Sequence, residues 1–149
     1  MPDKLYWDSN AFLAWLQNER GREAACRDTL TAAQSGEYII VSSALTIAEV
    51  LWIRGAPKLS EDKADVLNRW FRRSFFRVVN LDRRIAQRAQ RLVWENGIKP
   101  KDAVHVATAF QYGCPILETF DGQLIAKAAD LEGVHVREPQ PAKQGSLNV

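Results

Sequence analysis

Residues 5–19, LYWDSNAFLAWLQNE, join a strand pattern directly to a helix pattern, and this junction decides the fold. The first three residues are a short apolar run, and Asp8, Ser9 and Asn10, which follow them, favour turns and helix N-caps. Apolar residues then recur every three to four positions, which is typical of a helix with one buried face. We therefore expect a buried strand that ends at Asp8 and leads straight into a helix.

The remainder of the chain repeats this alternation of strands and helices. Apolar runs predict further strands at 38–41, 75–81, 115–120 and 134–136, of which the last is an edge strand. Helical spacing and capping residues predict helices at 22–34, 44–53, 61–73, 83–96, 100–112 and 122–130, with Ser60 and Asp82 as N-caps. Strands that alternate with helices form a parallel sheet covered on both faces. The expected fold is an α/β, three-layer α/β/α sandwich with a central, mostly parallel sheet of four to five strands.

Length and composition indicate a single domain. A chain of 149 residues with 46% hydrophobic residues can bury one core of ordinary size. We assign residues 1–137 to this domain and residues 138–149 to a disordered tail. The sequence has no run of eighteen apolar residues and no secretory signal pattern, so we expect a cytoplasmic protein with no membrane association. Cys26 and Cys114 have no C-x-x-C partner and are expected to be small buried side chains.

The net charge of +2 conceals an uneven distribution. Residues 69–101 hold ten of the 20 Lys and Arg but only Asp82 and Glu95 of the 18 acids, so this stretch carries +8. The other residues therefore hold ten basic and sixteen acidic groups, a charge of −6, and some of those acids must lie close together. A basic surface beside an acidic pocket is typical of a metal-dependent enzyme that acts on a polyanion.

Four acidic residues stand in apolar surroundings, two directly after strands and two within helices: Asp8, Asp121, Glu49 and Asp102. Buried carboxylates need a partner, and a hard divalent cation such as Mg²⁺ satisfies this need because it prefers oxygen ligands. Such an ion generates hydroxide from bound water and stabilises the charge that develops when a phosphodiester is attacked. Metal-free acid–base catalysis would instead require two carboxyls of contrasting environment or a well-placed imidazole, for which His105 is the candidate. These acids therefore predict a catalytic metal site.

Four motifs occur in an order that resembles a known family. The motifs are LYWDSNAF, VSSALTIAEVL, KDAVHVATA and LETFDGQL, and together they span about residues 4–137. Their order and spacing resemble the PIN-domain family, and within it the VapC-type toxins of bacterial toxin–antitoxin pairs. The resemblance implies an endoribonuclease with an α/β/α sandwich that uses Mg²⁺ or Mn²⁺.

The same resemblance assigns roles to individual residues and suggests partners. It places the catalytic and metal-binding acids at Asp8, Glu49, Asp102 and Asp121. Asn10 and Thr119 match polar family residues that orient the ligands or the substrate rather than bind the ion. Family members commonly dimerise and are inhibited by a small antitoxin that covers the acidic groove, so the expected partners are RNA, a cognate antitoxin and a second copy of the chain.

One residue departs from the family pattern. Trp7, preceded by Tyr6, stands where the family usually has a small or aliphatic residue before the first acid. The large ring either narrows the pocket or fills the core. The departure therefore bears on the shape of the substrate more than on metal binding.

Each candidate residue also has a structural interpretation. Asp8, Asp102 and Asp121 can each be a helix cap or a turn residue, and Glu49 can belong to a polar helix surface. His105 lies one helical turn after Asp102 and either positions substrate or is a packed, hydrogen-bonded residue. The joint occurrence of all four acids favours the metal site.

Basic and aromatic residues allow two interpretations as well. Eight arginines either lie on solvated helix faces or include one or two that contact RNA phosphates: Arg69, Arg72, Arg73, Arg77, Arg83, Arg84, Arg88 and Arg91. Most of the five tryptophans are expected in the core, although Trp15 and Trp52 would mark a partner groove if they were exposed together. His135 has no partner pattern and is expected to be structural.

Three other functions fit part of the pattern. The first is a PIN-like module that binds nucleic acid or protein without catalysis, although such a module would be expected to have lost one of the four acids. The second is phosphotransfer to Asp8, which normally requires a second Asp where Asn10 stands. The third is a nuclease for structured DNA, which usually carries helical insertions for which 149 residues leave no room. An endoribonuclease that serves as the toxin of a toxin–antitoxin pair fits the whole pattern.

Overall fold

Five strands form one parallel sheet in the computed structural model, which describes residues 2–51 and 59–141. The strands are β1 (Asp3–Trp7), β2 (Tyr38–Ser43), β3 (Phe76–Val79), β4 (Ile116–Glu118) and β5 (His135–Arg137). Their order in the sheet is β3-β2-β1-β4-β5, and every neighbouring pair is parallel. The predicted α/β fold is confirmed, and β5 is an edge strand as expected.

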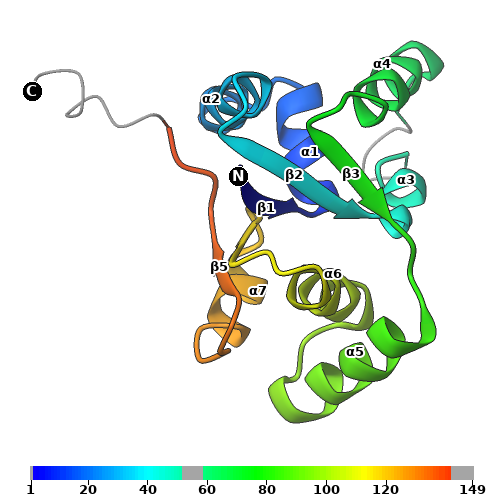
Figure 1. Ribbon diagram of the computed structural model, residues 1–149, viewed down its shortest axis with the longest axis vertical. Helices are drawn as coiled ribbons and strands as arrows, with labels where there is room; N and C mark the ends of the chain where they lie inside the picture. The colour runs from blue at the N-terminus through cyan, green and yellow to red at the C-terminus, as the bar shows by residue number, and fades with distance from the viewer. Residues whose placement is uncertain (1, 52–58, 142–149) are drawn as a thin grey trace, which may run out of the picture.

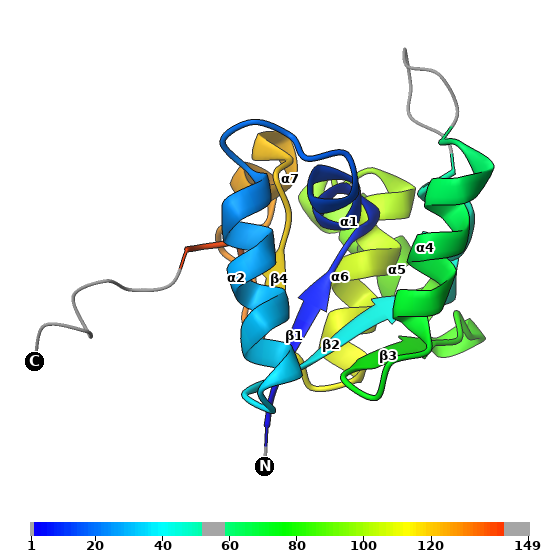
Figure 2. The ribbon, with the colours of Figure 1, turned by 90° about the horizontal axis from the view of Figure 1, so that it is seen from above.

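Seven helices in the described residues cover the two faces of this sheet. They are α1 (Ser9–Leu16), α2 (Glu23–Gln34), α3 (Ala44–Glu49), α4 (Glu61–Phe71), α5 (Arg83–Asn96), α6 (Pro100–Gln111) and α7 (Gly122–Lys127). Figure 1 shows α1, α2 and α4 on one side of the strands and α5 and α6 on the other. Seen from above in Figure 2, α2 and α4 lie in front of the strands and α6 lies behind them.

The alternation of side chains along the strands builds a separate core on each face. Leu5 and Trp7 of β1 pack with α1, α2 and α4, whereas Tyr6, between them, packs with α5 and α6. Ile40 and Val41 of β2 divide between the two faces in the same way. This division follows from the two-residue period of a strand, and it explains why the strands are apolar on both faces.

The predicted helix ends are largely those of the structure. The hydroxyl of Ser60 accepts from the backbone N–H of Lys63, and the Asp82 carboxylate accepts from that of Ile85 at 2.9 Å, so both residues are N-caps. Gly97 ends α5 with a φ of 67°, in the left-handed region where glycine is least strained. The capping residues therefore predicted these helix ends correctly from the sequence.

Some elements differ in length from the prediction. Helix α3 ends at Glu49, four residues earlier than expected, so Glu49 stands in its last turn rather than in its middle. Trp52 and the predicted helix end at 54–57 lie outside the described residues, as do positions 142–149 of the expected tail. Cys26 and Cys114 are free and buried, as predicted. Within the described residues, no helix has both the length and the apolar character needed to cross a membrane.

The strand order places a crevice next to β1. From β1 the chain moves outward through β2 to β3 and then returns to the opposite side of β1 with β4. In open parallel sheets, ligands bind beyond the carboxyl ends of the strands at the point where the order reverses. That point lies between β1 and β4, directly before Asp8 and close to Asp121.

Candidate active site

A cleft of about 810 Å³ opens at this position. All four predicted acids line it, and they come from four separate segments of the chain: Asp8, Glu49, Asp102 and Asp121. The fold thus brings together residues up to 113 positions apart, from Asp8 to Asp121. Leu13, Leu45 and Ala48 supply apolar parts of the same wall.

Asp8 is both a helix cap and a wall of the cleft. Its Oδ1 atom accepts from the backbone N–H of Ala11 at 3.1 Å and so caps α1. Burial raises the pKa of Asp8 to about 6, against lowering by the charge of His105 and by a hydrogen bond from Thr119, and the Asp102 carboxylate raises it further. The cap and the metal-ligand interpretations are therefore compatible, because one carboxylate can serve both purposes.

Asp102 and Asp121 interact across the cleft. Asp102 lies in the first turn of α6, where burial and then the negative charge of Asp121 raise its pKa. Asp121 caps α7, since its Oδ1 atom accepts from the backbone N–H groups of Gln123 at 3.0 Å and Leu124 at 3.3 Å. Asp102 in turn raises the pKa of Asp8, and both effects are those of like charges that have been brought close together.

Glu49 has a different environment within the same cleft. Its Oε1 atom accepts from the Ser9 hydroxyl at 2.9 Å and lies 2.6 Å from His105 Nε2. Burial alone would raise the pKa of Glu49, but the hydrogen bond and the charge of His105, with smaller effects of Ser9 and Lys101, lower it below its ordinary value. This carboxylate is therefore held in its ionised form.

A chain of buried hydrogen bonds fixes the orientation of His105. The backbone N–H of Ser43 donates to the Tyr6 hydroxyl at 3.1 Å, and that hydroxyl lies 2.6 Å from His105 Nδ1. Burial, together with the charge of Asp8, keeps the pKa of Tyr6 well above its ordinary value, so the hydroxyl retains its proton. On the other side of the ring, His105 Nε2 lies 2.6 Å from Glu49 Oε1. His105 is packed and hydrogen-bonded, which was one of the two roles considered for it.

Asn10 and Thr119 connect the two strand-ending turns. The Asn10 side-chain oxygen accepts from the backbone N–H of Phe120 at 3.1 Å. The fully buried Thr119 hydroxyl accepts from the backbone N–H of Asp121 at 3.1 Å, and a hydrogen bond from Thr119 also lowers the pKa of Asp8. These contacts hold the segments that carry Asp8 and Asp121 in a fixed relation.

The cleft is also lined by three residues that the sequence did not identify as site residues: Ser9, Lys99 and Lys101. Lys99 lowers the pKa of Asp102, and Lys101 lowers that of Glu49, so both cations act on the acidic groups. The motif KPKD at 99–102 was a usable signal, because it sets two cations beside a predicted metal ligand. No sequence signal pointed to the role of Ser9, because its hydrogen bond with Glu49 joins positions forty residues apart.

The oxygen-rich lining fits a hydrated hard cation. The acids supply carboxylate oxygens, and Mg²⁺ usually takes only one or two protein carboxylates and keeps several waters. Within the part of the chain that the structure describes, no group of three or more Asp, Glu, His or Cys side chains is arranged to hold one metal ion. The donor chemistry therefore suits an ion bound through a small number of carboxylates and through water, rather than one enclosed by all four acids.

Most of the tryptophans that the structure describes have ordinary packing roles. Trp7 is fully buried, and its indole N–H donates to Glu118 at 2.9 Å, so it fills the core. Trp15 and Trp70 pack edge to face with ring centroids 5.1 Å apart. Trp94 is the exception, since it is 85% exposed.

The family model described as "PIN domain" matches residues 5–131, which include all four acids, most of β1 and the whole of β2, β3 and β4. The chain belongs to the PIN domain family. Among curated proteins no match is found.

Solved structures share this PIN fold at low sequence identity. A toxin–antitoxin complex from Klebsiella pneumoniae has 23% identity and a TM-score of 0.64, and the match covers 92% of this chain and 98% of the other. The Mycobacterium tuberculosis toxin VapC20, described as cleaving the sarcin-ricin loop, has 17% identity and a TM-score of 0.64, with coverage of 88% and 98%. The PIN domain endonuclease Utp24 has 17% identity and a TM-score of 0.51, with coverage of 91% and 84%.

Proposed function

We propose that this PIN domain protein is a metal-dependent endoribonuclease that hydrolyses RNA phosphodiester bonds in the acidic cleft, and that it is the toxin of a toxin–antitoxin pair. The observation that carries the proposal is the cluster of acids from four segments in one cleft, in which Asp102 raises the pKa of Asp8 and Asp121 raises that of Asp102. Repulsion between these like charges lowers the stability of the folded state, and a bound dication would offset that repulsion.

The residues that would hold Mg²⁺ or Mn²⁺ are Asp8, Asp102 and Asp121, with Glu49 completing the acidic wall. When bound, such an ion lowers the pKa of a coordinated water and neutralises charge on a phosphodiester. Asp8 and Asp121 keep their positions through their helix caps, and Asn10 and Thr119 brace the two turns that carry them. The acids are thus preorganised for an ion that they share through one or two carboxylates and water.

Glu49 lies in the same cleft, hydrogen-bonded to the residue after Asp8. Both of its described hydrogen bonds, from Ser9 and His105, reach Oε1. They fix the carboxylate in its ionised form, ready to accept a hydrogen bond from a water molecule or to bind a cation. His105 acts through Glu49 and is a positioning residue.

The proposed partners are an RNA substrate, a cognate antitoxin and a second copy of the chain. The Klebsiella pneumoniae structure of similar fold is a toxin–antitoxin complex, and the Mycobacterium tuberculosis toxin is described as cleaving the sarcin-ricin loop. Ile47 and Leu51, on and just after α3, are 43% and 44% exposed, so this edge of the cleft offers apolar surface to a protein partner. We place the domain at residues 1–137 and the protein in the cytoplasm.

Cleavage-site sequencing of total RNA, treated with the parent protein or with Asp8→Asn, tests the activity. Asn is as good an N-cap as Asp, so the variant keeps the α1 cap and loses the negative charge. We expect Mg²⁺-dependent cuts by the parent and none by the variant, with equal helical content by circular dichroism. Equal cleavage by both proteins would contradict the proposal. RNA binding without cleavage by the parent would instead indicate a non-catalytic binding module.

Expression in bacteria tests the toxin role separately. We expect growth arrest by the parent, no arrest by Asp8→Asn, and relief by a small protein encoded beside the gene. Harmless overexpression of a protein that is active on RNA would contradict the toxin role and leave the nuclease activity standing.

A further inference from the structure

Trp94 is an exposed indole on a helix that otherwise presents polar groups. It lies in the last turn of α5 and is 85% exposed, whereas the exposed fractions of Ile47, Leu51, Leu81 and Phe110 lie between 42% and 44%. A tryptophan so fully exposed to water contributes little to the stability of the monomer. Its role is therefore to be sought in binding.

The surroundings of Trp94 are polar and basic rather than apolar. Residues one and two turns before it on the same helix face are Arg91, Gln90 and Gln87. Helix α5 carries four arginines and Glu95 as its one acid, and Glu95 is paired with Arg91 at 2.6 Å. A protein interface centred on a tryptophan would be expected to gather further apolar side chains around it. A basic helix with a lone exposed ring suits a nucleic-acid strand instead.

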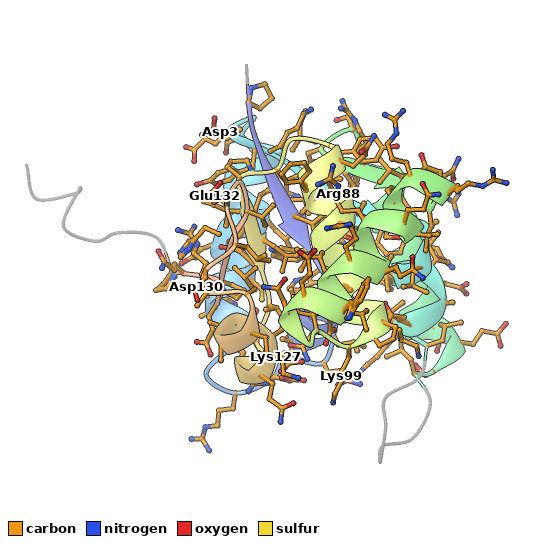
Figure 3. All side chains as sticks on the ribbon, turned by 90° about the horizontal axis from the view of Figure 1, so that it is seen from below. Asp3, Arg88, Lys99, Lys127, Asp130 and Glu132 are labelled. Atoms are coloured by element: carbon orange, nitrogen blue, oxygen red, sulfur yellow. The ribbon has the colours of Figure 1, made fainter. Side chains whose placement is uncertain are left out.

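The end of α5 that carries Trp94 is the end nearest the acidic cleft. Helices α5 and α6 pack against each other and are joined by the short turn at 97–99. Lys99, the N-cap of α6, ends this turn, and Lys101 and Asp102 follow in the first turn of α6. Figure 3 shows Lys99 at this end of the two helices, with Arg88 farther back along α5. Both lysines are exposed and line the cleft.

We propose that Trp94 stacks on a base of a single-stranded RNA whose phosphates Lys99 and Lys101 contact at the entrance of the cleft. The inference rests on the proposed function, in that RNA is the substrate of this cleft. Aromatic stacking accepts every base because each has a π-face, and the lysines supply sequence-independent attraction to the backbone. Trp94 is thus a positioning residue that holds the strand on one side of the site of cleavage.

The test compares Trp94→Ala and Trp94→Phe with the parent protein. Fluorescence anisotropy with a labelled twelve-nucleotide single-stranded RNA, in EDTA to prevent cleavage, gives the dissociation constant. We expect Trp94→Ala to bind roughly tenfold more weakly and Trp94→Phe, which retains a ring for stacking, to stay within about threefold of the parent. Leu81→Ala is the matched control, because Leu81 is an exposed apolar residue before the opposite end of α5, and it should bind as the parent does.

Steady-state cleavage gives a second readout that a merely structural role would not produce. On a long RNA, Trp94→Ala should raise KM about tenfold and leave kcat unchanged, and on a dinucleotide too short to reach α5 it should change neither. Lys99→Ala should weaken binding of the twelve-nucleotide RNA and lower its salt dependence, whereas Trp94→Ala should leave the salt dependence unchanged.

Each result bears on the inference separately from the proposed function. Parent-like RNA affinity of Trp94→Ala would overturn the inference, as would a changed oligomeric state in sedimentation velocity with unchanged RNA affinity, because Trp94 would then be a protein contact. If the parent binds RNA without cutting it and Trp94→Ala loses that binding, the inference stands and the proposed activity fails. If the parent cleaves RNA and Trp94→Ala keeps the parent KM, the activity stands and the inference fails.

Discussion

The carboxylates of the acidic cleft differ in how they are satisfied. Burial raises the pKa of Asp8 to about 6, and burial with the charge of Asp121 raises that of Asp102. Hydrogen bonds from His105 and Ser9 instead bring the pKa of Glu49 below its ordinary value despite burial. The protein groups around Glu49 thus stabilise its charged form, whereas those around Asp8 and Asp102 do not offset the effect of burial. We therefore propose that a metal ion would bind beside Asp8 and Asp102.

The sharpest test of this comparison removes the charge of Asp8 or of Glu49 in metal-free protein. A change in the pKa of Asp8 from 3.8 to about 6 on folding corresponds to as much as about 3 kcal/mol against the folded state at neutral pH. Asp8→Asn in EDTA at pH 7.5 should therefore raise the free energy of unfolding by about 2–3 kcal/mol. Glu49→Gln should lower it, because its pKa is shifted in the opposite direction. Urea unfolding measures both, and a destabilised Asp8→Asn would contradict the comparison.

The same pair predicts a pH dependence of definite sign. Since the folded pKa of Asp8 lies above the unfolded value, the parent is more stable below pH 4 and loses stability as the pH rises from about 4 to about 6. The advantage of Asp8→Asn should be full above pH 6 and vanish towards pH 4. Urea titrations at half-unit pH steps in EDTA measure this difference, and an advantage that does not vary with pH would rule out Asp8 as its source.

Loss of His105 should be the next largest effect. His105→Ala removes one of the two hydrogen bonds to Glu49 Oε1 and the contact between the buried Tyr6 hydroxyl and Nδ1. We expect RNA cleavage to fall roughly ten- to a hundredfold, the usual range for residues that orient ligands of a metal site. Single-turnover kinetics measures the chemical step, and circular dichroism checks the fold. Unchanged cleavage by folded His105→Ala would show that Glu49 needs no positioning.

Ser9→Ala should give the smallest of these effects. It removes one hydrogen bond to Glu49, worth about 1 kcal/mol, and leaves the His105 contact in place. Cleavage should fall only a few-fold, and addition of the change to His105→Ala should cost less than the two separate losses combined, because both act through one carboxylate. A double-mutant cycle on cleavage rates measures this coupling, and strict additivity would contradict it.

The fold followed from the sequence because its signals are local. Alternation in β1, the caps at Ser60 and Asp82 and the turn at Gly97 each depend on residues within a few positions. Asp8 and Asp121 were found for the same reason, since each directly follows an apolar strand and the carboxyl ends of parallel strands meet at one edge. Helix α3 was predicted too long, because the apolar pattern continues beyond Glu49 although the helix ends there.

The rest of the site depends on contacts between distant segments. The chain from Ser43 through Tyr6 and His105 to Glu49 joins four elements, and no spacing in the sequence encodes it. Core packing was a correct expectation for Trp7, but Trp94 shows that an apolar residue in an amphipathic helix can still lie away from the buried stripe formed by Ile85 and Ala89. Helical phase, rather than residue type, decides that outcome.

Direct measurement of divalent-metal binding tests the central claim, that a cation binds beside Asp8 and Asp102 in the cleft. Isothermal titration calorimetry with Mn²⁺ at pH 7.5 should show binding to the parent, strong loss of affinity in Asp8→Asn and Asp102→Asn, and a smaller loss in Glu49→Gln. Equal Mn²⁺ affinity in the parent and in folded Asp8→Asn, or no binding to any of these proteins, would contradict the account.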